Sequence, residues 1–147
     1  MLKDKGILKA IWVGMWILCG VLGYLPPQEG ANAVLLAVLA VGFFAAPGWL
    51  VWVSYGKGDL GQVKLVRNVS LISLAGTLVL IVANMMSVLG TPELGNALYS
   101  ILAAWSVPMF CGQYWALSLL LWAMLLWGSQ LALRKAKETT QRKSLEK

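Results

Sequence analysis

The chain has 147 residues and a formal net charge of +6; 59% of its residues are hydrophobic and only 12% are charged. A typical globular domain carries about 25% charged residues, and a soluble chain of this size buries too little of its surface to hide so many apolar side chains. The composition therefore excludes a soluble domain, a disordered chain, a disulfide scaffold and a nucleic-acid-binding module. It predicts an integral membrane protein.

Four apolar runs, taken in chain order, are long enough to cross a bilayer. A helix rises about 1.5 Å per residue, so about 20 apolar residues cross roughly 30 Å of hydrocarbon. The sequence predicts transmembrane helices at about 7–25, 33–55, 69–89 and 108–133. The first run ends at Pro26 and the second at Gly56, whereas the third ends shortly before Pro92.

The stretch between the third and fourth predicted spans is apolar but too short to cross the membrane. Residues 97–107, at about 1.5 Å each, reach only about half of the hydrocarbon thickness. We expect a short interfacial or re-entrant helix at about 97–107, bent near Pro108 into the fourth span. The predicted fold class is an all-α integral membrane protein with one four-span domain over residues 1–147.

Basic residues occupy three short segments that flank the apolar runs, and they predict the orientation. They lie at residues 3–9, 57–67 and 134–147, and the last segment is a basic tail. With both termini in the cytoplasm, every Lys and Arg lies inside, and a fifth span would move the tail outside, against the positive-inside bias. We therefore expect a plasma-membrane protein, most simply of a bacterial cytoplasmic membrane, with a cytoplasmic tail. Its predicted partner is a bilayer with anionic headgroups and not nucleic acid.

Polar side chains recur along one side of the third predicted span. Several are seven residues apart, a spacing typical of helix packing, and small or hydroxyl side chains let membrane helices approach closely. The alternative is a polar wall along a substrate path. The candidate helix-packing or pore-lining residues are Ser70, Ser73, Thr77, Asn84, Ser87 and, in the fourth span, Gln113.

Two prolines lie inside apolar runs and predict kinks. Pro47 and Pro108 cannot donate to the carbonyls of Phe43 and Ala104, four residues earlier. Such freed carbonyls build substrate sites in some transporters. In other membrane helices they bind water or hydroxyl groups nearby.

A local similarity at an offset of 64 residues suggests an internal repeat. Residues 29–33 read Glu-Gly-Ala-Asn-Ala and residues 93–97 read Glu-Leu-Gly-Asn-Ala. Duplication of a two-helix hairpin is one interpretation, and some transporters are built in this way. The other is that any outer loop that opens a helix favours Asn as its N-cap.

The sequence offers no catalytic, cofactor-binding or metal-ligating residues. It has no His, and no Asp or Glu lies inside a predicted span, where proton pumps place them. Residues 56–61 match G-x-G-x-x-G, but a dinucleotide site needs that loop inside a βαβ unit. We expect a non-enzymatic structural or assembly component of the membrane, as a homo-oligomer or with a larger membrane protein. The alternative is a small oligomeric transporter or channel built from two-helix repeats.

Overall fold

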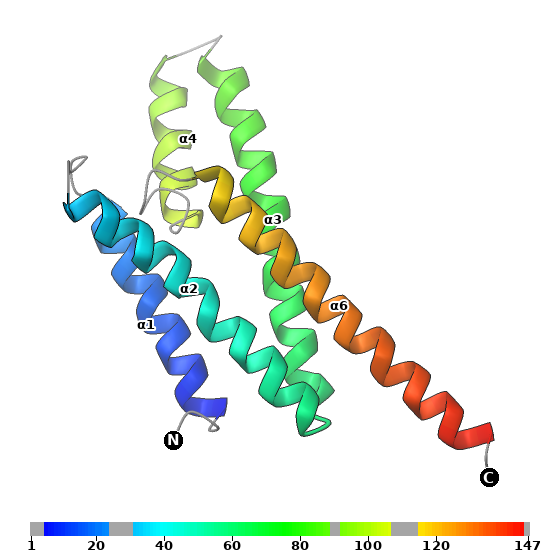
Figure 1. Ribbon diagram of the computed structural model, residues 1–147. Coiled ribbons are helices and arrows are strands. Elements are labelled where there is room, and N and C mark those ends of the chain that lie inside the picture. The colour runs from blue at the N-terminus through cyan, green and yellow to red at the C-terminus, as the bar shows by residue number, and fades with distance from the viewer. Residues whose placement is uncertain (1–4, 24–30, 89–91, 107–114, 146–147) are drawn as a thin grey trace.

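The computed structural model describes residues 5–23, 31–88, 92–106 and 115–145, and these residues are helical apart from short turns. The prediction of an all-helical protein is therefore confirmed for this part of the chain. Figure 1 shows the five helices and their order. They are α1 (Lys5–Gly23), α2 (Ala31–Gly56), α3 (Leu60–Val88), α4 (Pro92–Trp105) and α6 (Trp115–Leu145).

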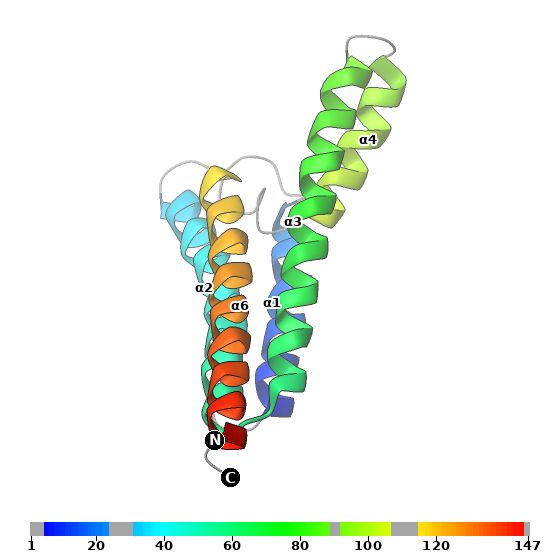
Figure 2. The same cartoon turned by 90° about the vertical axis from the view of Figure 1, so that its right-hand side faces the viewer.

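The long helices run up and down, so that both chain ends lie at one end of the molecule. Helix α1 pairs with α2, α3 returns in the direction of α1, and α6 runs back toward the level of the N-terminus (Figures 1 and 2). Helix α4 folds back along the far half of α3. The turn between α2 and α3 lies at the same end as the two termini. We call this end the basic end, because it carries the described basic residues Lys5, Lys9, Lys57, Lys64, Arg67, Arg134, Lys135, Lys137, Arg142 and Lys143.

Three helices in the described part of the chain are long and apolar enough to cross a membrane. They comprise Ala37–Gly56, Leu60–Ser87 and Ala116–Thr139, and the apolar part of α1, Gly6–Leu22, is shorter. Their outer surfaces are also apolar: Trp52, Val79 and Met86 are each about two-thirds exposed. Helices that are apolar on every side are typical of membrane spans. The structure therefore supports a membrane location.

A cluster of aromatic rings lies where the helices meet. The ring centroids of Phe43 and Phe44 on α2 lie 5.8 and 5.1 Å from that of Trp122 on α6, in edge-to-face geometry. Trp12 on α1 lies 6.2 Å from Phe43. Helix α3 joins the same core through Val66. Edge-to-face contacts at these separations are favourable beyond the area that the rings bury.

Helix α3 begins nine residues earlier than the predicted start at residue 69, which corrects the predicted boundary. The turn after α2 is short because Gly58 adopts a left-handed backbone with φ of 69°. The Asp59 N–H then donates to the Ser54 carbonyl at 2.9 Å. Lys64 and Arg67 lie within α3 because basic residues are good helix formers. Their charge indicates where the chain meets the expected membrane surface, but it does not indicate where the helix begins.

Helix α6 likewise differs from the predicted fourth span of 108–133. It begins at Trp115 in the described residues and continues through most of the basic tail to Leu145. Lys, Arg, Glu and Gln have high helix propensity, so the tail extends the helix beyond its apolar part. Residues 108–114, and with them the predicted kink at Pro108, lie outside the described residues.

Helix α4 corresponds to the helix predicted at 97–107, but it begins five residues earlier and ends at Trp105. Pro92 is its first residue, a position where proline is favoured because its missing N–H would be unpaired. Glu93 follows in the first turn, where a carboxylate complements the helix dipole. Pro47, in contrast, does not end α2: the helix continues through it, and the proline is fully buried.

The turn between α2 and α3 provides a test of the fold. Gly58→Ala should lower the free energy of unfolding by about 1 kcal/mol, because an L side chain is disfavoured in the left-handed region. The measurement is a detergent titration of unfolding followed by circular dichroism. Gly56→Ala is the matched control, since a Cβ there meets no atom within 4 Å. Equal midpoints for the two variants would contradict the proposed role of Gly58.

Candidate functional site

In the described part of the chain, an apolar groove of about 810 Å³ lies between α1, α3 and α4. This volume falls within the range of about 300–1,000 Å³ that small-molecule sites occupy. Rings of α2 and α6 also contribute to it. The lining residues are Lys9, Trp12, Val13 and Trp16 of α1; Leu65, Val69, Ile72 and Ser73 of α3; Ile101, Ala104 and Trp105 of α4; and Phe43 and Trp122.

Helical periodicity explains why these residues share one groove. The four residues on α1 are spaced by three, one and three positions, which places them on one face of the helix. The four on α3 follow the related spacing of four, three and one. Since α1 and α3 run in the same direction (Figure 1), the two faces form opposite walls.

The two ends of the groove differ in chemistry. Lys9 and Leu65 come early in α1 and α3, toward the basic end, whereas Trp16 and Ser73 come later in the same helices. Lys9 is the one charged residue in the lining. A lysine at such a place packs its aliphatic stem on apolar surface and keeps its ammonium near the membrane surface. The arrangement suits binding of an apolar molecule rather than catalysis.

Trp105 lines the groove where α4 packs closely on α3. A Cβ added to Gly76 of α3 would lie 2.6–2.8 Å from three atoms of the Trp105 indole. Only glycine lets the rigid ring approach so near to the backbone. The position of Trp105 in the groove depends on this contact.

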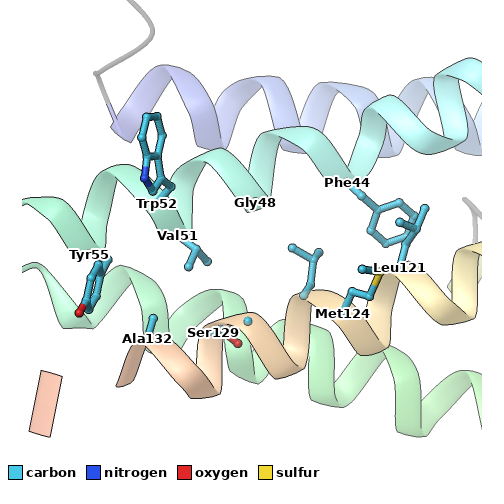
Figure 3. A pocket seen from close by; sticks show the side chains of 11 residues that line it. Phe44, Gly48, Val51, Trp52, Tyr55, Leu121, Met124, Ser129 and Ala132 are labelled. Carbon is cyan, nitrogen blue, oxygen red and sulfur yellow. The ribbon is translucent and has the colours of Figure 1, made fainter. Parts of the chain in front are cut away.

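The second cavity, of about 410 Å³, lies between α2 and α6 on the other side of the aromatic cluster. Figure 3 shows Phe44 and Leu121 at one end of it and Tyr55 and Ala132 at the other. Its Ser129 hydroxyl donates to the Leu126 carbonyl at 2.9 Å, within the same helix. Because the Ser129 hydroxyl already bonds within its own helix, this cavity has fewer polar groups that could recognise a ligand than the groove has.

The polar residues predicted on the third span do not gather in one cavity. Ser70 and Thr77 are buried, and their hydroxyls have no hydrogen-bond partner in the described part of the chain. The Ser87 hydroxyl donates to the Asn84 carbonyl at 2.8 Å, whereas the buried Asn84 Oδ1 has no donor among the described residues. Of the five candidates among the described residues, Ser73 alone lines the groove. Gln113 lies outside the described residues.

The two residues whose carbonyls the sequence analysis singled out belong to the lining of the same groove. Phe43 and Ala104 both line the groove, although they belong to α2 and α4. Lys9, Trp12 and Trp16 were not predicted as site residues. Their spacing on one face of α1 was readable in the sequence, but the opposite wall on α3 was not.

The contact between Gly76 and Trp105 gives a second test. Gly76→Ala should destabilise the protein by about 1–3 kcal/mol, because overpacking forces the rigid indole and the helix apart. Thermal unfolding in detergent measures the change, with Gly14→Ala as the control, since a Cβ there meets nothing within 4 Å. Trp105→Leu in the Gly76→Ala background should restore part of the loss. No rescue, or equal loss in both glycine variants, would contradict the proposed contact.

Comparisons with known proteins do not assign this arrangement to a family. No family model, no curated protein and no solved structure matches the chain. The functional interpretation therefore rests on the groove, the aromatic cluster and the distribution of charge.

Proposed function

We propose that the protein is a non-enzymatic, four-span component of a bacterial cytoplasmic membrane that assembles with another membrane protein. The observation that carries this proposal is the aromatic cluster of Trp12, Phe43, Phe44 and Trp122, which fills the space where the helices meet. The larger cavity beside it is lined mainly by apolar residues. Such a centre suits packing and binding in the plane of the membrane better than passage of a polar substrate.

The four proposed spans are α1, α2, α3 and α6. Helix α1 has 19 residues, about 28 Å at 1.5 Å per residue, which nearly matches the roughly 30 Å of hydrocarbon. Helix α4 has 14 residues and reaches only about 21 Å. Since it lies beside the far half of α3 (Figure 2), we assign it as a re-entrant helix.

The distribution of charge supports an orientation with both termini in the cytoplasm. The termini and the turn between α2 and α3 share the basic end (Figure 1), whereas Glu93 begins α4 at the far end of α3. Basic residues near the ends of spans favour the cytoplasmic side. We therefore place the basic end in the cytoplasm.

Transport has less support than assembly. A polar path would bring Asn84, Gln113 and the carbonyls of Phe43 and Ala104 to one hydrated cavity. Phe43 and Ala104 line the groove, but Asn84 is not among its lining residues. The groove instead presents apolar side chains on most of its walls, so we favour the assembly role.

The far end of the α3–α4 hairpin offers a surface for assembly. Helix α3 extends beyond α1 at the end away from the termini (Figure 2). This extension, which we call the tip, exposes Val82, Met85, Met86 and Leu94. We propose that the apolar surface of another membrane protein covers it.

The proposed topology is testable with reporter fusions. A reporter that is active only in the cytoplasm should be active after Lys147 and inactive within residues 90–96, because this places the basic residues inside. A reporter active only outside should give the reverse pattern and serves as the control. An extracellular signal from the fusion after Lys147 would contradict the four-span assignment.

Assembly through the tip is testable by purification in mild detergent. Val82→Gln should lower the amount of co-purifying membrane protein about fivefold, as expected when an interface residue contributes about 1 kcal/mol. Val38→Gln is a matched control, because Val38 on α2 is 62% exposed and Val82 is 61% exposed. Equal recovery of the partner with both variants, or a wild-type protein that purifies alone as a monomer, would contradict the proposal. If a second copy of this chain is the one protein recovered, the tip binds another copy of the chain and not a different membrane protein.

A further inference from the structure

We propose that the groove binds an anionic phospholipid from the leaflet at the basic end, with one acyl chain between α1 and α3 and the phosphate beside Lys9. This inference rests on the proposed membrane function, because it needs the basic end at a membrane surface. It goes beyond general contact with headgroups, since it assigns a defined site to one lipid.

The length of the groove matches one leaflet rather than a whole bilayer. From Lys9 to Trp16 it extends about 10 Å along α1, and from Leu65 to Ser73 about 12 Å along α3. Half of the hydrocarbon core is about 15 Å thick. A partner helix that crosses the membrane would need a groove about 30 Å long. Trp105, whose indole packs against Gly76, also lines this groove.

The walls of the groove suit an acyl chain. Trp12, Trp16 and Trp105 present large aromatic surfaces, and Val13 and Ile72 add aliphatic ones that are more than half exposed. A flexible acyl chain packs against such irregular apolar surface through many weak dispersion contacts. The groove, with a volume of about 810 Å³, has room for an acyl chain.

The charge at the open end complements a phosphate. Lys9 is the charged residue in the lining, and it lies in the first half of α1, toward the basic end. A Lys ammonium forms strong charge-assisted hydrogen bonds with phosphate oxygens. Attraction of anionic lipid to a basic residue near the surface adds to this. Lys64 of α3 lies at the same end but is exposed and outside the lining, so it provides a control.

The test is native mass spectrometry of the full-length protein after incubation with dioleoyl phosphatidylglycerol or dioleoyl phosphatidylcholine. The two probes share their acyl chains and differ in headgroup charge. Wild type should retain one phosphatidylglycerol in preference to phosphatidylcholine. Lys9→Gln should lower that preference about fivefold, whereas Lys64→Gln should leave it unchanged. Equal preference in both lysine variants would overturn the assignment of the phosphate to Lys9.

A second pair of variants tests the position of the acyl chain. Val13→Trp fills the groove from a residue that is 56% exposed, and it should lower retention of both lipids about tenfold or more. Val79→Trp is the control, because Val79 is 67% exposed and does not line the groove. Ile72→Trp, from the opposite wall, should act as Val13→Trp does and guards against a folding defect in one variant. The proposal would be overturned if both groove variants retained lipid as wild type does. It would also be overturned if these variants abolished a dimer and not lipid retention.

These results are separable from the test of the proposed function. Lipid retention in detergent does not depend on which side of the membrane the termini occupy or on a partner at the tip. If the groove variants retain lipid as wild type does while the reporter fusions give the expected topology, the results contradict the lipid site and leave the proposed function in place. If the fusions fail while retention depends on Lys9, the orientation is wrong and the lipid site stands.

Discussion

The packing of aromatic rings between α1, α2 and α6 is the interaction on which the rest of the structure depends. Lipid tails are as apolar as leucine, so burial of apolar surface alone does not drive membrane helices together. Close packing must do so, and the rings of Phe43, Phe44 and Trp122 contact one another edge to face, with Trp12 beside them. Phe43 and Trp122 line the groove, whereas Phe44 lines the cavity of Figure 3. The same rings thus hold three helices together and separate the two cavities.

The length of α3 determines the outline of the molecule. Because α3 begins directly after the short turn at Gly58, its 29 residues start at the basic end and continue beyond α1. The extra length needs a partner within the chain, and α4 supplies it by folding back along α3. The same arrangement produces both features that we assign to function: the tip, which extends beyond α1, and the groove, which α4 helps to line.

The polar residues of α3 show how membrane helices use small side chains. Ser70 and Thr77 are buried, where their size permits close approach of neighbouring helices. Ser87 satisfies its hydroxyl on a carbonyl of its own helix. Ser73 lies on the same side of α3, three residues after Ser70 and four before Thr77, and it lines the groove together with aliphatic neighbours. The spacing of polar residues therefore identified one side of α3, but it did not identify the aliphatic and aromatic residues that make up most of the groove.

Composition and hydrophobic run length determined that the chain is helical and apolar enough for a membrane, because both follow from local properties of each segment. The described basic residues share one end of the structure, and the cytoplasmic placement of that end stays a prediction from the charge pattern. The starts of α3 and α4 were predicted too late, since basic residues and Pro92 are as compatible with a helix as with its flanks. The groove was decided by tertiary structure alone. Its walls come from α1, α3 and α4, and only packing brings Lys9 and Leu65 to one groove and Trp105 against Gly76. These placements depend on contacts between residues far apart in the chain, which the periodicity of a single helix does not encode.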